Sequence, residues 1–172
     1  MSGTCSAVLI ILPPYQIFLR PMRRKAAQLH DSDAREILQT GIWGTLATAD
    51  SGGQPYAVPM NYAVMKDTVY LHSAQEGHKL ENVRENPLVS FSVVEKAEVL
   101  ANTFDMAYRS VILFGTARFV EEKTEKQNAL QMLMEKYSPD GHDAASEYIN
   151  RNIERTAVIA IEIQHITAKA AN

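Results

Sequence analysis

One short segment brings together side chains suited to binding a phosphate group. Ser73, Gly77, His78 and Lys79 lie where an expected strand passes through a loop into an expected helix. The first amides of a helix lack helical acceptors and carry about half a positive charge, which favours an anion. Lys79 adds a full charge, Ser73 a hydroxyl donor, and His78 a ring that can donate a proton or stack. The segment predicts a phosphate site; the alternative is a simple strand-to-helix crossover with a solvated lysine.

A second candidate is a proline-containing stretch of an expected strand, formed by Pro59, Met60, Asn61 and Tyr62. Because proline cannot donate to a strand ladder, the strand is expected to lie at a sheet edge or to bulge there. Its free backbone groups could then contact a flat ligand. An edge strand protected against aggregation explains the same residues without any ligand.

Tyr108 and Arg109 form a third candidate at the start of a long apolar strand. Arg109 could bind an anion with two parallel hydrogen bonds or cross a subunit interface, and a strand-end ion pair is the simpler interpretation. His30, His142 and His165 have no ligand-like spacing, so no metal site is predicted.

Composition limits the classes of function. The chain has 172 residues, of which 46% are hydrophobic and 22% charged, as expected for one globular domain. Its 17 basic and 20 acidic residues give a net charge of −3, which argues against a nucleic-acid binder, so a phosphate must be held locally. The single cysteine, Cys5, excludes an intrachain disulfide and predicts a reducing, cytoplasmic setting.

Residues 1–21 differ from the rest of the chain, because Arg20 is their one charged side chain. The apolar run Ala7–Leu12 is far shorter than the roughly 20 residues that cross a bilayer, so no membrane segment is predicted. It also lacks the positive stretch of a secretory signal. Either Met22 is the native start, or residues 1–21 form an N-terminal arm that could add an edge strand to a partner.

Hydrophobic alternation predicts a mainly β chain, a small antiparallel barrel with peripheral helices. The first three strands are expected to form a meander joined by tight turns. The six expected strands are Trp43–Ala49, Tyr56–Met65, Thr68–Ser73, Leu88–Val94, Tyr108–Val120 and Thr156–Thr167. Helices are expected at Ser32–Thr40, within Gly77–Asn86, from Thr124 to Tyr137, and at Asp143–Asn152.

Local signals set several of these bounds. Ser32 or Asp33 is expected to cap the first helix, and Thr124 to open a capping box. Pro87 should end the second helix, because proline disfavours the helical conformation of the residue before it. Gly115 predicts a bulge or bend in the strand that contains it.

Residues 22 to about 167 resemble the flavin-binding split-barrel proteins related to pyridoxamine 5'-phosphate oxidase, most closely the branch of the 5-nitroimidazole-resistance reductases. The order and spacing of the matching stretches carry the resemblance. These stretches are Met22–Lys25, Gly44–Thr48, Pro55–Tyr62, Tyr70–Ala74, Glu76-Gly77, Lys79-Leu80, Asn86-Pro87, Tyr108–Ile112, Phe114-Gly115 and Ala117-Arg118.

The resemblance implies a six-stranded antiparallel FMN-binding split barrel over residues 22–172, with residues 1–21 as an extension outside the match. It also implies a homodimer that binds FMN in clefts between its subunits. His72 matches a histidine that this branch places near the flavin ring, where it would donate a proton or orient the substrate; a packed strand-end residue is the alternative. The implied cofactor-binding residues are Pro59, Met60, Asn61, Tyr62, His72, Ser73, Gly77, His78, Lys79, Tyr108 and Arg109, the last two from the second subunit or its interface.

The expected function is an FMN-dependent oxidoreductase that reduces small, flat, electron-poor acceptors such as nitroimidazoles and other nitroaromatics. One alternative is a protein that binds flavin, haem or a deazaflavin without turnover. Another is a pyridoxamine 5'-phosphate oxidase, although the chain has no clear equivalent of the C-terminal residues with which those enzymes hold their substrate.

Overall fold

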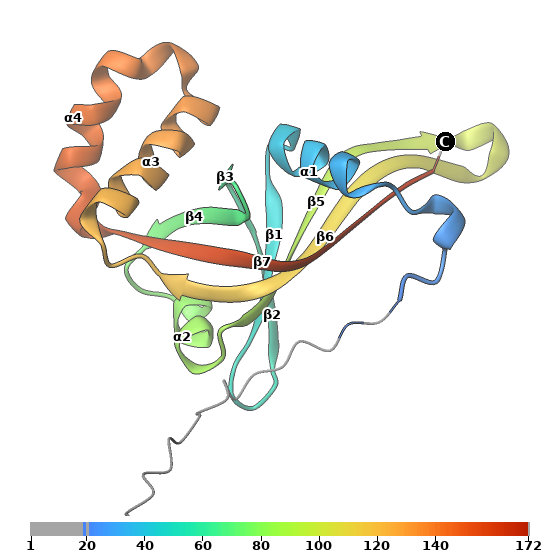
Figure 1. Ribbon diagram of the computed structural model, residues 1–172, viewed down its shortest axis with the longest axis horizontal. Coiled ribbons are helices and arrows are strands. Elements are labelled where there is room, and N and C mark those ends of the chain that lie inside the picture. The colour runs from blue at the N-terminus through green and yellow to red at the C-terminus, as the bar shows by residue number, and fades with distance from the viewer. Residues whose placement is uncertain (1–18, 20, 172) are drawn as a thin grey trace, which may run out of the picture.

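A computed structural model describes residue 19 and residues 21–171, apart from the side chains of residues 141–144. Predictions about residues 1–18 and 20 therefore lie outside the described residues. Over the described range, the chain forms one antiparallel sheet with helices around it (Figure 1). The strands are β1 (Gly44–Ala49), β2 (Pro55–Met60), β3 (Tyr62–Met65), β4 (Thr68–Ala74), β5 (Leu88–Leu100), β6 (Asp105–Phe119) and β7 (Thr156–Ala171). The α-helices are α1 (Asp31–Thr40), α2 (His78–Glu85), α3 (Lys123–Tyr137) and α4 (His142–Asn152).

The mainly β, split-barrel fold class is confirmed, but the described residues form seven strands rather than six. The strand expected over Tyr56–Met65 is two strands, β2 and β3, interrupted at Asn61. The two expected hairpins form, because β1 pairs with β2 and β3 pairs with β4. The strand order β2-β1-β5-β6-β7-β4-β3 nevertheless places β2 and β3 at opposite edges of the sheet, so the three expected strands are not one continuous meander. Because the chain runs directly from one edge strand to the other, the sheet has to curl towards a barrel.

A hydroxyl group from α3 explains the interruption. Tyr137 Oη accepts from the backbone N–H of Tyr62 (3.0 Å) and lies 3.0 Å from the carbonyl oxygen of the same residue. It also donates to the carbonyl oxygen of Ile42 at 2.6 Å. The backbone groups of Tyr62 thus have a side-chain partner at the point where the chain changes edges.

The predicted bulge at Gly115 is confirmed. The β6–β7 register shifts between Phe114 and Gly115. A Cβ built on Gly115 would lie 2.1 Å from the carbonyl oxygen of Glu162, so no side chain fits between the strands there. Glycine at this position permits the close approach that bends the sheet.

Two predicted helix caps are wrong. α1 begins after His30, whose backbone N–H donates to Asp33 Oδ2 at 3.1 Å, so Ser32 and Asp33 lie inside the helix. α3 is capped by Glu122, whose carboxylate accepts from the amides of Thr124 (2.7 Å) and Glu125 (2.5 Å). A carboxylate two residues earlier thus satisfies the first amides in place of the Thr124 hydroxyl. The end of α2 at Glu85, just before Asn86-Pro87, is as predicted.

Two apolar clusters hold the fold together. The larger fills the curled sheet and includes the fully buried Leu46, Tyr62 and Phe91. The smaller joins α3 and α4 to β4 and β7, through residues such as Leu130 and Val158. The second cluster fixes the α3–α4 pair against the strand that carries His72 (Figure 1). Within the described residues, each helix is too short or too polar to cross a bilayer.

Candidate cofactor and acceptor site

The predicted phosphate segment is a strand, a loop and a helix in direct succession. β4 ends at Ala74 and α2 begins at His78, with Gly77 as the N-cap residue. Gly77 has φ of +132°, a conformation that residues with a side chain rarely adopt. A Cβ added there would meet no atom within 4 Å, so the backbone turn, not crowding, requires glycine. The position where a Gly77 side chain would stand is therefore open.

The side chains of this segment have distinct contacts. The His78 ring lies 4.3 Å from the Tyr56 ring, centroid to centroid, which ties the start of α2 to β2. Ser73 Oγ donates to the carbonyl oxygen of Ala74 at 2.7 Å, so its proton is already engaged. Lys79 is half-buried in the first turn of α2. Lys79 and the helix amides are therefore the positive groups of this turn.

His72 lies on β4, opposite Val158 of β7, and borders a cavity of about 300 Å³. His72 is exposed at the edge of the cavity, and partial loss of surrounding water still lowers its pKa below 6.5; the positive charge of Lys79 lowers it further. The imidazole is consequently neutral at pH 7. The charge of Lys79 thus acts on His72; the role of both residues at a flavin stays a prediction.

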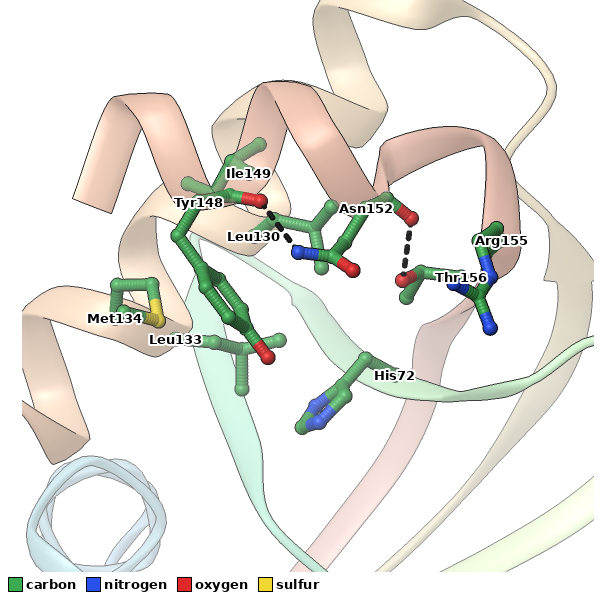
Figure 2. Close-up of a pocket in the computed structure, with 9 residues that line it drawn as sticks. All are labelled: His72, Leu130, Leu133, Met134, Tyr148, Ile149, Asn152, Arg155 and Thr156. Carbon is green, nitrogen blue, oxygen red and sulfur yellow. Dashed lines mark hydrogen bonds between the residues drawn. The ribbon is translucent and has the colours of Figure 1, made fainter. Parts of the chain in front are cut away.

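Helical residues make up most of the cavity wall (Figure 2). Asn152 Nδ2 donates to the carbonyl oxygen of Tyr148 at 2.8 Å, and Thr156 Oγ1 donates to the carbonyl oxygen of Asn152 at 2.9 Å. Besides His72, the wall consists of Leu130, Leu133, Met134, Tyr148, Ile149, Asn152, Arg155 and Thr156.

The proline stretch lies at a sheet edge, as expected, because β2 is the first strand in the order. Pro59 and Asn61 are exposed, and Met60 is buried. Tyr62 is fully buried: its hydroxyl donates to the carbonyl oxygen of Leu38 at 2.7 Å and its ring packs against Phe91. Pro59 and Asn61 therefore present surface to a ligand, whereas the Tyr62 ring belongs to the core. Contact of this stretch with a flavin stays a prediction.

Tyr108 and Arg109 lie far from the phosphate segment of the same chain. They occupy the β5–β6 arm, which projects beyond the rest of the sheet (Figure 1). Nine residues of β6 separate Arg109 from Arg118, which pairs with Ala160 beside β4, and that is about 30 Å of extended strand. Arg109 bonds the carboxylates of Glu95 (2.7 Å) and Glu36 (3.1 Å), the ion pair considered as the simpler interpretation. Contact of these two residues with a flavin, which would require a second subunit, stays a prediction.

Four polar residues of the cavity were not predicted: Tyr148, Asn152, Arg155 and Thr156. The sequence indicates a helix at Asp143–Asn152 but gives no sign that it faces His72, more than 70 residues earlier. The pairing of β4 with β7 brings the two segments together. The one local signal is that Arg155 immediately precedes the final strand.

Comparisons with known proteins agree on the fold. No curated protein matches the chain. Among solved structures, a candidate 5-nitroimidazole antibiotic resistance protein from Bacteroides thetaiotaomicron is 26% identical, with a TM-score of 0.68 over 83% of this chain and 86% of its own. A conserved hypothetical protein from Mycobacterium tuberculosis is 21% identical, with a TM-score of 0.75 over 87% of this chain and 90% of its own. A FAD- and haem-binding protein from Mycobacterium smegmatis is 19% identical, with a TM-score of 0.70 over 85% of this chain and 74% of its own.

A family model described as pyridoxamine 5'-phosphate oxidase matches residues 30–170. The matched range contains the whole sheet, the four α-helices and His72 with the phosphate segment, apart from the final residue of β7. The chain belongs to the pyridoxamine 5'-phosphate oxidase-like family.

Proposed function

We propose that the protein is an FMN-dependent oxidoreductase that reduces small electron-poor acceptors such as nitroimidazoles and other nitroaromatics. The observation that carries the proposal is geometric: β4 places His72 at the edge of a cavity and continues through a short loop into α2, whose first turn carries Lys79. One segment therefore joins an anion-binding helix start to a titratable side chain beside a cavity. The name of the similar Bacteroides thetaiotaomicron protein, a candidate 5-nitroimidazole antibiotic resistance protein, supports the same acceptor class.

The residues present fit a flavin phosphate. The start of α2 offers helix amides beside Gly77, where a side chain would meet no atom within 4 Å, and Lys79 adds a full positive charge. Glu76 in the loop and Glu81 in the first turn oppose an anion, so the fit rests on Lys79 together with the amides. Ser73 can join as a donor once its hydroxyl turns away from the Ala74 carbonyl.

A flavin held at this segment would supply the reducing chemistry, two electrons for each acceptor. Reduction of a nitro group to a nitroso group also consumes two protons and releases water. Neutral His72 holds an N–H on one ring nitrogen and an acceptor on the other, so it can orient the nitro oxygen and pass a proton to it. The apolar wall of the cavity, formed by residues such as Leu133 and Ile149, excludes water from the acceptor.

The proposed active form is a homodimer. Phe104 is 99% exposed and Val99 71% exposed, both on the β5–β6 arm that also carries Tyr108 and Arg109. Burial of these apolar side chains against a second copy would bring Tyr108 and Arg109 towards its cofactor site. Sedimentation equilibrium of the full chain should give twice the chain mass, and Phe104→Ser should shift the protein towards monomer. A monomeric wild-type protein would contradict this part of the proposal.

Stopped-flow oxidation of the reduced, FMN-loaded protein by a nitroimidazole tests the function. His72→Ala should bind FMN with unchanged affinity and react about 100-fold more slowly, as expected for loss of a general acid or base. His165→Ala removes a histidine that stacks on Phe114 in β6 and should react at the wild-type rate. An unchanged rate in His72→Ala would remove His72 from the chemistry.

The main competing function is ligand binding without turnover. The similar Mycobacterium smegmatis protein binds FAD and haem by its name, but that likeness is one of fold alone. A wild-type protein that binds FMN or haem and is not oxidised by any acceptor would favour this alternative. Hydrogen peroxide formed in air on addition of pyridoxamine 5'-phosphate would instead indicate an oxidase.

A further inference from the structure

We infer that the cavity beside His72 accepts planar aromatic molecules that carry an anionic group, with Arg155 as the residue that selects the anion. The inference deepens the proposed function, because it assigns the acceptor class to the same site. It rests on the shape and lining of the cavity and on the position of one arginine. The segment that binds the cofactor phosphate is not part of it.

The interior of the cavity is apolar and made by two helices. Leu130, Leu133 and Met134 come from α3, and Ile149 comes from α4. A volume of about 300 Å³ is at the lower end of the range for small-molecule sites, about 300–1,000 Å³. Such a space suits a ligand of one or two rings with an apolar face.

Four polar side chains line this cavity together with His72. Figure 2 shows the side-chain oxygen of Asn152 above His72, with Thr156 and Arg155 on one side of it and the Tyr148 hydroxyl on the other. Asn152 is held in that orientation, because its Nδ2 donates to the carbonyl oxygen of Tyr148 at 2.8 Å. The arrangement offers a ligand one cation, one fixed acceptor and the neutral imidazole.

Arg155 is available for an ionic contact. Within the described part of the chain, no hydrogen bond or ion pair of Arg155 is found, whereas Arg35, Arg109, Arg118 and Arg151 each contact a carboxylate. Among the described residues that line the cavity, none is a glutamate or an aspartate. Because a guanidinium matches the geometry of a carboxylate, a ligand that bears one would complete the site.

Two ligands of nearly equal shape, 4-nitrobenzoate and the neutral 4-nitrobenzamide, separate the contribution of the ligand's charge to the affinity from that of its ring. Calorimetric titration of the FMN-loaded protein at low salt should show about five- to tenfold tighter binding of the acid, the value of one charge-assisted contact at an exposed site. Arg155→Gln should remove this preference by weakening the acid alone. Added salt should reduce the preference in the wild-type protein.

Arg151→Gln is the matched control. Arg151 lies one turn earlier, in α4, pairs with Glu147 and does not line the cavity, so the variant loses the same charge and should keep the wild-type preference. Equal affinity for the two compounds in the wild-type protein, or a preference that survives in Arg155→Gln, would overturn the inference. Weakened FMN binding in Arg155→Gln would overturn it as well, because Arg155 would then serve the cofactor.

Measuring reduction as well as binding of the two compounds tests the proposed function separately from the anion site. Arg155-dependent binding of 4-nitrobenzoate without its reduction would support the anion site and contradict acceptor reduction. Reduction of both compounds at equal efficiency in wild type and Arg155→Gln would support the oxidoreductase and contradict the anion site.

Discussion

The surroundings of His72 disfavour its charged form, and this has a consequence for stability as well as for chemistry. Its pKa in the folded chain is lowered below 6.5, first by desolvation and then by Lys79. The folded state therefore binds this proton less readily than the unfolded chain does. His72 contributes stability above pH 6.5 that is lost as the pH falls through the lowered pKa.

Chemical denaturation at a series of pH values should reveal this effect. Between pH 7 and pH 5, the free energy of unfolding of the wild-type protein should fall relative to that of His72→Gln, which has no proton to bind. Parallel curves for the two proteins over this range would show that His72 is not desolvated in the folded chain.

The folded state also disfavours the charged form of Lys136. Its Nζ lies 3.8 Å from the centre of the Tyr62 ring, and burial lowers its pKa from 10.5 to about 8. At pH 7 the charged lysine is partly desolvated in the folded state, and the contact with the ring offsets only part of that cost.

Lys136→Met keeps the apolar length of the side chain and removes its charge. We expect the variant to be more stable at pH 7 by about 1 kcal/mol, a modest value because solvent still screens a half-buried charge. The difference should shrink between pH 8 and pH 10.5, where the wild-type lysine is neutral when folded and still charged when unfolded. A pH-independent difference in urea denaturation would contradict the assignment.

At the scale of the elements, the junction between β2 and β3 depends on one hydroxyl group from α3. Tyr137 Oη contacts the backbone of both Ile42 and Tyr62. Tyr137→Phe would leave the N–H of the buried Tyr62 without this acceptor, at a cost of about 1–3 kcal/mol. Thermal or urea denaturation measures the loss. Tyr148→Phe, an exposed tyrosine on α4, is the control, and equal stability of the two variants would contradict the role of the Tyr137 hydroxyl.

The bulge at Gly115 gives a second prediction for the elements. A Cβ at Gly115 would meet a backbone oxygen at 2.1 Å, whereas at Gly52 the closest atom would be a side-chain oxygen of Asp50 at 3.2 Å. Gly115→Ala should therefore destabilise the chain by about 3 kcal/mol or more, and Gly52→Ala should change stability by less than about 1 kcal/mol. Denaturation midpoints that move equally in both variants would contradict this.

The same elements differ in whether the sequence could predict them. The helices, the edge position of Pro59 and the bulge at Gly115 follow from local rules, and the structure has them. The division of β2 from β3 depends on Tyr137, 75 residues from Tyr62, so no local rule could place it. Arg155 could not be predicted for the same reason, because the pairing of β4 with β7 is what places it in the wall of the same cavity as His72.

For the whole molecule, a net charge of −3 requires that anions be bound by local features. Two such features are the start of α2 with Lys79 and the cavity wall at Arg155. In the proposed enzyme the first holds the cofactor phosphate and the second selects the acceptor beside His72. The phosphate site is the central claim, because the other roles depend on a flavin bound there.

Fluorescence titration of the wild-type chain with FMN and with riboflavin tests that claim most directly, because the two ligands differ only by the phosphate. FMN should bind at least about tenfold more tightly, and Lys79→Met should lose most of this preference. Lys123→Met, which removes the same charge from the start of α3, should retain it. Equal affinity for FMN and riboflavin, or no uptake of either, would contradict the account.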